Sequence, residues 1–501
     1  MSDITIGTNH PVVLTGARRV GHTGQVDVLV RDGRVAAIGT ELRAGPRVER
    51  VALDGRTVVP GLWDAHTHLT QWALARRRLD VSGARSAAEA AALVARRLAP
   101  GADGGADGAG GPPPPGLALV GAGFRDALWP DEPTARLLDE VAGEVPVVLV
   151  SGDLHCAWAS SAGLRLLGVT HPTGLLRESE WLPLQGVVDH VPDAVADALV
   201  ADALRVAATR GVVGVVDLEL ADNLAVWRRR PTPAVRVRAG VWEEHLDRVV
   251  REDLHTGDRV ADLVEQGPFK VITDGSLNTR TAYCHDPYPG TTSRGVLAVP
   301  PERLVPLMAY ARAHGLRCAI HAIGDAANGL ALDAFAATGA HGSVEHAQLL
   351  TREDVARFAR LDVVASVQPE HAMDDRDVAD HHWAGRTGRA FAFGDLQRAG
   401  VKLALGSDAP VAPLDPWAAI DAAVWRARDG RQAWHPEQRI DVLAALASSV
   451  DERPLGLRVG DRADLAVLDE DPVALAGTPG ALRSMPVAGT LVGGGWAHRA
   501  L

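Results

Sequence analysis

The sequence predicts an α/β protein built as a (β/α)8 TIM barrel, because strand-like and helix-like segments alternate over most of its 501 residues. Such alternation is typical of parallel strands joined by crossover helices, and a barrel with insertions accommodates a chain of this length. The first barrel strand is expected to end at His66. The other seven are expected at residues 211–220, 235–242, 269–273, 316–321, 342–346, 362–367 and 401–406.

Helices are expected between these strands. Residues 301–314 place Leu304, Leu307, Met308 and Ala311 at helical spacing, so one face of this segment is apolar. Residues 327–338 form a second helical segment, between the strands expected at 316–321 and 342–346. Both segments fit the crossover connections that parallel strands require.

The interval from Thr70 to about residue 200 is too long for an ordinary connection, since strand-to-helix loops hold only a few residues. It therefore predicts an inserted subdomain. Within it, residues 101–116 are rich in Gly, Ala, Asp and Pro, which indicates a flexible surface loop. Because the connection leaves the C-terminal end of the first strand, we expect the insertion to cover the mouth of the barrel.

Composition excludes several classes of protein. The formal net charge of −12 argues against a nucleic-acid surface, and no stretch approaches the length of a membrane span. The N-terminus lacks a basic segment leading into an apolar one, and the three cysteines form no disulfide framework, so a cytoplasmic protein is expected. The expected partner is a small-molecule substrate; the sequence leaves open whether two copies form a homodimer.

Two histidines with one residue between them follow the first expected strand. His66 and His68 share a side of the chain if the strand continues through them, so two imidazole nitrogens can reach one cation. Taken alone, such a pair is weak support for a metal site, because a chain with 19 histidines produces pairs by chance.

Four more residues strengthen the metal hypothesis. Each lies at or near the C-terminal end of a short apolar run, and in a parallel barrel that end carries the chemistry. They are Lys270, His321, His346 and Asp408. Taken singly, His321 or His346 is better explained as a hydrogen-bonded core histidine, but the joint order of all these residues along the chain favours a metal centre.

At this point the chain resembles the amidohydrolase superfamily, and more narrowly its branch that includes N-substituted formamide deformylase (amidohydrolase family 3). The resemblance covers nearly the whole chain. Besides the H-x-H pair, it rests on the segments 151–158, 172–178, 274–282, 321–326, 367–369 and 406–410.

The resemblance implies a domain organisation. Strand-like segments at 26–30 and 34–39 return near the other end of the chain, at 463–468 and 487–492. Similar enzymes pair their two termini, so residues 1–59 and 455–501 are expected to form a composite β-sandwich beside a barrel of residues 60–454.

The resemblance also implies roles for the candidate ligands. His66 and His68 would hold the more buried metal, His321 and His346 the second metal or the substrate carbonyl, and Asp408 would both ligate and take the water proton. The expected cofactor is a divalent metal, zinc above all, as one or two ions. His321, His346 and Asp408 are thus the expected catalytic residues.

Lys270 carries two interpretations. Relatives carboxylate a lysine at the end of the fourth strand, where Lys270 falls, and the carbamate would bridge two metals about 3.5–4 Å apart. Otherwise the ammonium pairs with a carboxylate such as Asp274. Among other residues, Asp64 either orients a ligand imidazole or is a surface residue at the end of the strand; the sequence favours neither. The candidates for substrate contacts are His155, Trp158, Arg280, Gln368 and His371.

The favoured function is hydrolysis of a non-peptide C–N bond in an amide, formamide or cyclic amide through a metal-activated water. A metal-dependent deaminase of an aminated heterocycle is the alternative, since the same water can attack a ring carbon. A third hypothesis is that the barrel is catalytically silent and serves as a binding scaffold. The intact set of candidate metal ligands argues against this hypothesis.

Overall fold

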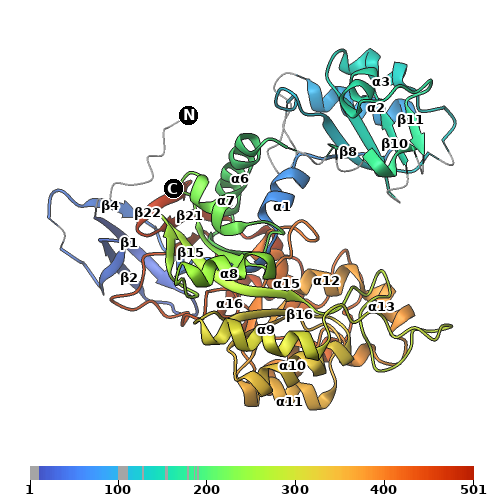
Figure 1. Ribbon diagram of the computed structural model, residues 1–501. Coiled ribbons are helices and arrows are strands. Elements are labelled where there is room, and N and C mark those ends of the chain that lie inside the picture. Colours follow the sequence, from blue (N-terminus) through green and yellow to red (C-terminus); the bar gives the residue numbers. More distant parts are fainter. Residues whose placement is uncertain are drawn as a thin grey trace. The chain divides into compact units, whose positions relative to one another are not determined.

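The computed structural model describes residues 11–501 apart from 44, 100–110, 127–128, 153–155, 178–179, 185–186 and 189–190. The chain divides into two compact units (Figure 1). One comprises Met1–Leu69 together with Leu204–Leu501, and the other comprises Thr70–Ala203. No helix within the described ranges is both long enough and apolar enough to cross a membrane.

The larger unit contains a (β/α)8 barrel, which confirms the predicted fold class. In the described residues, eight parallel strands follow one another around it in chain order. They are β6 (Leu62–Thr67), β12 (Val212–Asp217), β13 (Arg236–Val241), β15 (Val264–Ile272), β16 (Cys318–Ala322), β17 (Gly342–His346), β18 (Val364–Val367) and β19 (Leu403–Leu405). A short strand, β14 (Arg259–Ala261), pairs with β15 outside this path.

The first and last strands meet through the residues that follow them. The Asp408 amide donates to the His66 carbonyl at 2.8 Å, and the His68 amide donates to the Ala409 carbonyl at 2.9 Å. Thr67 and Ala409 form a parallel bridge. Closure of the barrel therefore brings the H-x-H pair and Asp408 together, although more than 300 residues separate them in sequence.

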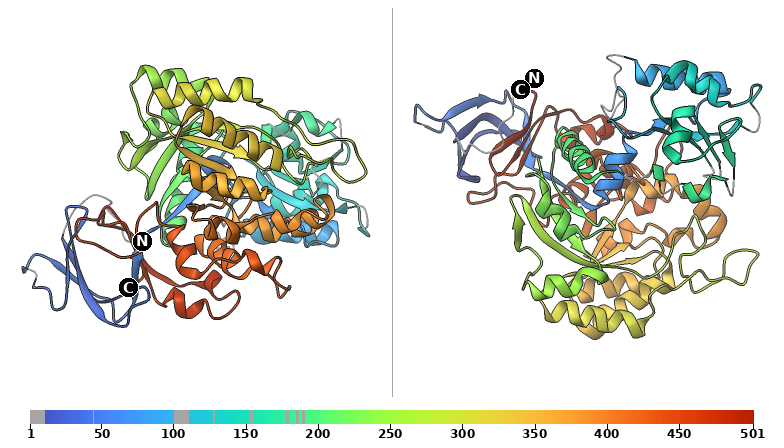
Figure 2. Two further views of the ribbon diagram at one scale, coloured as in Figure 1. Left: turned by 90° about the horizontal axis from the view of Figure 1, so that it is seen from below. Right: turned by 45° about the horizontal axis from the view of Figure 1, so that its top comes forward.

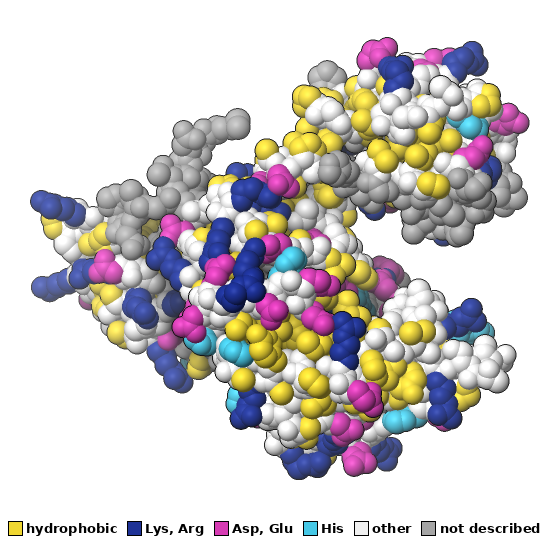
Figure 3. Space-filling model, viewed as in Figure 1, with side chains coloured by type: hydrophobic (Ala, Val, Ile, Leu, Met, Phe, Trp, Pro, Cys, Tyr) yellow, Lys and Arg dark blue, Asp and Glu magenta, His cyan; other side chains and the backbone are white. Residues whose placement is uncertain are grey.

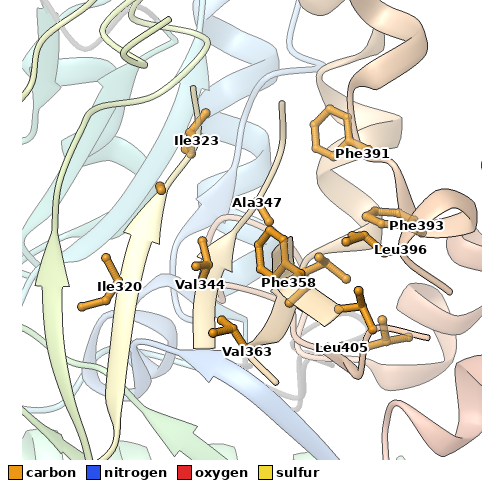
Figure 4. Close-up of a cluster of buried hydrophobic side chains, with 14 of the residues drawn as sticks. Ile320, Ile323, Val344, Ala347, Phe358, Val363, Phe391, Phe393, Leu396 and Leu405 are labelled. Atoms are coloured by element: carbon orange, nitrogen blue, oxygen red, sulfur yellow. The ribbon is translucent and has the colours of Figure 1, made fainter. Parts of the chain in front are cut away.

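Helices cover the outside of the strands. They include α7 (Asn223–Arg229), α8 (Glu243–Arg251), α9 (Pro301–Ala313), α10 (Asp325–Thr338), α11 (Arg352–Leu361), α12 (Pro369–Asp374), α13 (Arg376–His382), α14 (Phe393–Arg398), α15 (Pro416–Trp425) and α16 (Val442–Ala447). Figure 4 shows the apolar layer between strands and helices, where Val344 of β17 and Phe358 of α11 belong to one buried cluster. Burial of these apolar side chains stabilises the packing of the helices on the strands, whose carboxyl ends carry the candidate ligands.

The parallel register explains why the strand ends coincide. Lys270 of β15 pairs with Ala319 of β16, and Ala322 of β16 pairs with His346 of β17. Each ladder advances without a shift, so the carboxyl ends of β15, β16 and β17 reach the same end of the barrel. Lys270, His321 and His346 are thereby gathered on one side.

Both ends of the chain contribute strands to one sheet of the larger unit (Figures 1 and 2). Its order is β22-β21-β20-β5-β1-β2-β3, and β4 pairs with β1. The strands are β1 (Val12–Arg19), β2 (Gln25–Arg31), β3 (Arg34–Gly39), β4 (Glu49–Ala52), β5 (Thr57–Pro60), β20 (Leu465–Leu468), β21 (Val487–Val492) and β22 (Gly495–Arg499). The N-terminal and C-terminal parts of this sheet are joined by the pairing of β5 with β20. In the sequence, β5 directly precedes β6, the barrel strand that carries His66.

The second unit, Thr70–Ala203, has a sheet of its own with the order β11-β10-β9-β8-β7. Its strands are β7 (Leu79–Asp80), β8 (Leu119–Phe124), β9 (Val147–Ser151), β10 (Cys156–Ala159) and β11 (Leu175–Arg177). Its helices include α2 (Ala87–Leu98), α3 (Ala135–Ala142) and α4 (Ser161–Leu167); α1 (Leu69–Ala75) and α6 (Asp193–Ala208) extend across its boundaries. Of the loop expected at 101–116, residues 101–110 lie outside the described part of the chain.

Trp158 lies in the apolar core of this unit. Its side chain is 0% exposed on β10 and packs edge to face with Trp129, at 6.3 Å between ring centroids. Its expected contact with a substrate stays a prediction. His155, its expected companion, lies outside the described residues.

The visible surface mixes charges of both signs. In Figure 3, Asp and Glu side chains lie among Lys and Arg side chains across the face shown. Arg303 and Glu243, for example, form an exposed ion pair at 2.6 Å. An exposed pair of this kind contributes little to stability, because water screens both charges.

Candidate metal centre

The H-x-H pair faces Asp408. The His66 and His68 ring centroids are 5.6 Å apart, and His66 is almost fully buried. Nε2 of His66 lies 3.4 Å from Asp408 Oδ1, and Nε2 of His68 lies 3.3 Å from the same oxygen. Two ligand atoms that each lie 2.0–2.1 Å from a tetrahedral zinc are about 3.3–3.4 Å apart, so the observed spacings suit one ion.

Two of the candidate ligands have an unusual backbone. His346 has φ of 73° and Asp408 has φ of 58°, both in the left-handed region that side chains rarely adopt. A left-handed residue at the end of a strand interrupts the regular alternation of side chains. At functional sites such strain persists only where the surrounding structure holds it. Here it lets His346 contact His66, with 4.8 Å between ring centroids.

Asp408 also faces a second group of histidines. Potential ligand atoms of His346, His371 and Asp408 lie within 4.8 Å of one another, as do those of His66, His68 and Asp408. The His371 ring is nearly parallel to that of His346, at 6.2 Å, and its Nε2 lies 3.8 Å from Asp408 Oδ2. The structure therefore places His371, expected as a substrate contact, among the candidate ligands.

His321 lies beside this group without entering it. Its ring centroid is 4.5 Å from that of His346, but its Nε2 points toward the carbonyl of Gly275 and Asp274 Oδ1, each at 3.4 Å. Asp274 in turn accepts backbone hydrogen bonds from Tyr283, Ile323 and Gly324. These bonds fix the loop after β15 against the loop after β16, next to His321.

Lys270 does not form the ion pair with Asp274 that was its alternative interpretation. Its side chain is 2% exposed, and Nζ has no hydrogen-bond partner within the described residues. Burial lowers the pKa of Lys270, while the nearby charges of Glu345 and Asp408 act to raise it. A buried amine without a partner is costly unless something binds it.

Asp64 does not orient an imidazole, which corrects the first of its two interpretations. Its Oδ1 accepts the backbone amides of Ser407 at 2.9 Å and His66 at 3.1 Å, so it joins the two strand ends instead. Burial raises the pKa of Asp64 to about 6. The imidazole of His66 is held by Glu345, whose Oε2 lies 2.6 Å from Nδ1. Sequence reasoning missed Glu345, and its place directly before His346 is the only signal it offers.

The electrostatics of the cluster suit a cation. Burial, together with the charge of Lys270, lowers the pKa of His66 to about 4, and burial also lowers that of His346. Burial would raise the pKa of Asp408, but the surrounding imidazoles hold it well below its usual range. At neutral pH the imidazoles of His66 and His346 are therefore neutral and Asp408 is ionised, which are the forms that bind metals.

The comparisons with known proteins agree with this geometry. The model of the amidohydrolase family matches residues 49–495, which is most of the chain. The chain belongs to the amidohydrolase family. A metal-dependent hydrolase is therefore the activity class that its membership supports, and the family points to a divalent metal.

Individual relatives match this amidohydrolase over most of its length. The protein LONG AFTER FAR-RED 3 of Arabidopsis thaliana is 30% identical, over 88% of this chain and 83% of that protein. The N-substituted formamide deformylase of Arthrobacter pascens is 27% identical, over 93% of this chain and 94% of the relative. The crystal structure of an uncharacterized metal-dependent hydrolase from Pyrococcus horikoshii superposes with a TM-score of 0.75 at 26% identity, covering 94% and 99% of the two chains.

The residues present in the amidohydrolase fit a metal. His68 Nδ1, Lys270 Nζ, His346 Nδ1 and His371 Nε2 are buried and have no protein partner within the described residues. Buried polar atoms are otherwise almost always hydrogen-bonded. Ligand atoms of His66, His68, His346 and His371 also lie within 4.8 Å of Asp408, which is the arrangement expected of metal ligands.

The remaining expected substrate contacts differ in their surroundings. Gln368 is buried after β18, its Nε2 donates to the Ser366 carbonyl at 3.4 Å, and its Oε1 has no partner in the described part of the chain. Arg280 is exposed, with φ of 56°, in the loop after β15. The Gln368 backbone carbonyl accepts from the His371 amide at 3.1 Å, and the roles of Gln368 and Arg280 in substrate binding stay predictions.

Proposed function

We propose that this amidohydrolase hydrolyses a non-peptide C–N bond of a small amide, formamide or cyclic amide, with zinc as its metal. The observation that carries the proposal is the convergence of His66, His68, His346 and His371 on Asp408. The formamide deformylase relative, aligned over nearly the full length of both chains, supports the substrate class.

His66, His68 and Asp408 would hold one ion, and His346 with His371 or His321 a second. A divalent ion bound there would lower the pKa of a coordinated water to roughly 7 and would polarise a carbonyl oxygen. Asp408, which faces both groups, accepts the proton of the attacking water. As the new C–O bond forms and the C–N bond breaks, Asp408 returns that proton to the leaving nitrogen.

The neighbouring polar groups would bind the substrate. Gln368 Oε1 is an acceptor suited to an N–H of an amide. This atom is buried and has no hydrogen-bond partner within the described residues, so a hydrogen bond to the substrate would replace none in the protein. If His321 rather than His371 holds the second ion, His371 Nε2, which lies 3.8 Å from Asp408 Oδ2, would face the reacting carbonyl.

A substrate screen tests the reaction class. We expect the zinc-loaded enzyme to release amine and acid from N-substituted formamides or N-acyl amino acids, with release measured by an amine-reactive dye. Ammonia from aminated heterocycles, with no amide turnover, would instead show a deaminase. No turnover of any of these compounds by zinc-loaded protein would favour a binding scaffold and contradict the proposal.

Metal removal tests the same proposal without a choice of substrate class. Purified enzyme is expected to contain zinc by elemental analysis, and dialysis against a chelator should reduce turnover by at least about 10²-fold, because the activated water and the polarising cation are lost together. Added zinc should restore the rate. Full activity in metal-free protein would exclude this mechanism.

A further inference from the structure

Glu345 joins two elements of the candidate metal centre. It is 2% exposed and directly precedes His346 on β17, yet its side chain reaches across the barrel to His66 on β6. Consecutive side chains of a regular strand point to opposite faces. The left-handed backbone at His346 interrupts this alternation, so Glu345 and His346 both contact His66. One strand thus supplies a candidate ligand and a partner for another ligand.

Each oxygen of this carboxylate has its own hydrogen bond. Oε2 accepts from His66 Nδ1 at 2.6 Å, and Oε1 accepts from the Ser343 hydroxyl. Glu345 and Ser343 also line a cavity of about 650 Å³ in the barrel, together with Ser366 and Ala404. Two hydrogen bonds, one to each oxygen, therefore fix the direction of this buried carboxylate.

The bond to Glu345 determines which nitrogen of His66 carries the proton. An ionised carboxylate only accepts, so Nδ1 must donate, and the neutral ring then leaves Nε2 as a bare acceptor. That Nε2 lies 3.4 Å from Asp408 Oδ1, which is also an acceptor. Two acceptors at this distance repel each other unless a cation lies between them.

We propose that Glu345 is a positioning residue that holds His66 as the Nδ1–H tautomer and thereby directs Nε2 at the cation. This inference rests on the proposed metal site. It assigns Glu345 no contact with the substrate. In metal sites, carboxylates that hold a ligand imidazole in this way typically contribute 10- to 100-fold in metal affinity.

Three variants separate positioning from general stability. Glu345→Leu removes the acceptor. Glu345→Gln keeps an acceptor for Nδ1–H but loses the negative charge. Asp217→Asn is the matched control, because Asp217 is another fully buried carboxylate, bonded to Trp227 Nε1 at 2.8 Å and not to an imidazole of the cluster.

The first readout is nitrogen NMR of histidine-labelled, metal-free protein, with the His66 signal assigned by its loss in His66→Asn. We expect the Nδ1–H tautomer in the wild type, in Glu345→Gln and in Asp217→Asn, and loss of this preference in Glu345→Leu. A wild-type His66 protonated at Nε2 would overturn the proposal. A role in stability alone would lower the melting temperature without changing the tautomer.

The second readout is zinc affinity, measured by competition with a chromophoric chelator and no substrate. Glu345→Leu should bind zinc about 10- to 100-fold more weakly, Glu345→Gln should lose a smaller factor, and Asp217→Asn should match the wild type. If Glu345→Leu does not fold, the tautomer of His66 in the wild type decides, and a ring protonated at Nε2 would overturn the proposal. Both readouts are independent of the reaction, so an error in the substrate class leaves this test intact.

Discussion

Asp408→Asn is expected to lower kcat by about 10²- to 10⁴-fold, the range that a general acid or base contributes. The carboxamide keeps the shape of the side chain and tolerates the left-handed backbone at φ of 58°, so the fold should persist. It cannot accept the proton of the attacking water. The rate is to be measured at saturating zinc, with metal content and melting temperature determined in parallel.

Asp362→Asn is the matched control for this variant. Asp362 is also an aspartate with a left-handed backbone, at φ of 50°, but it is exposed and pairs with Lys402 on the surface. Its replacement tests whether exchanging Asp for Asn at a left-handed backbone position itself lowers the rate, and we expect the wild-type kcat. A near-wild-type rate in metal-loaded Asp408→Asn would remove Asp408 from the mechanism.

Lys270 is expected to react with carbon dioxide and to carry a carbamate in the active enzyme. Its amine is buried and has no protein partner within the described residues, and burial lowers its pKa, which favours the neutral amine that reacts. The chain has only two lysines, Lys270 and Lys402, among 51 basic residues. Arginine cannot form a stable carbamate, so lysine at this position is consistent with the modification.

The scarcity of lysine makes the measurement direct. Enzyme stripped of metal and reconstituted with zinc and carbon-13 bicarbonate should show a carbamate signal by NMR, which Lys270→Arg abolishes and Lys402→Arg retains. Lys402 is exposed and forms an ion pair with Asp362, so it is the matched control. Lys270→Arg should also lose at least about 10²-fold in kcat/KM, the scale of removing one electrostatic group. An unmodified Lys270 in fully active enzyme with one metal per chain would contradict this prediction.

The barrel was predictable from sequence because its signal is local. Each strand is a short apolar run, and all eight expected runs correspond to strands of the structure. The meeting of His66, His68 and Asp408 follows from the same logic, since parallel strands present their carboxyl ends together. Lys270, His321 and His346 also reach this end of the barrel.

The remaining features of the site depend on geometry that the sequence does not display. The pairing of Glu345 with His66 spans 279 positions and requires the left-handed backbone at His346. Asp64 adjoins the histidine pair in sequence, but its side chain bonds to backbone amides. Trp158 lies in a motif-like segment and yet packs in a core, because motif resemblance carries no information on burial.

Anomalous X-ray scattering at the zinc edge tests the central claim most directly. Crystals of active, zinc-loaded enzyme should show a peak in bonding contact with His66 Nε2, His68 Nε2 and Asp408 Oδ1, the three atoms whose separations suit one tetrahedral ion. A second peak, if present, should adjoin His346. Active crystals with no peak at these atoms, or with zinc bound only elsewhere, would contradict a metal-dependent hydrolase built on this cluster.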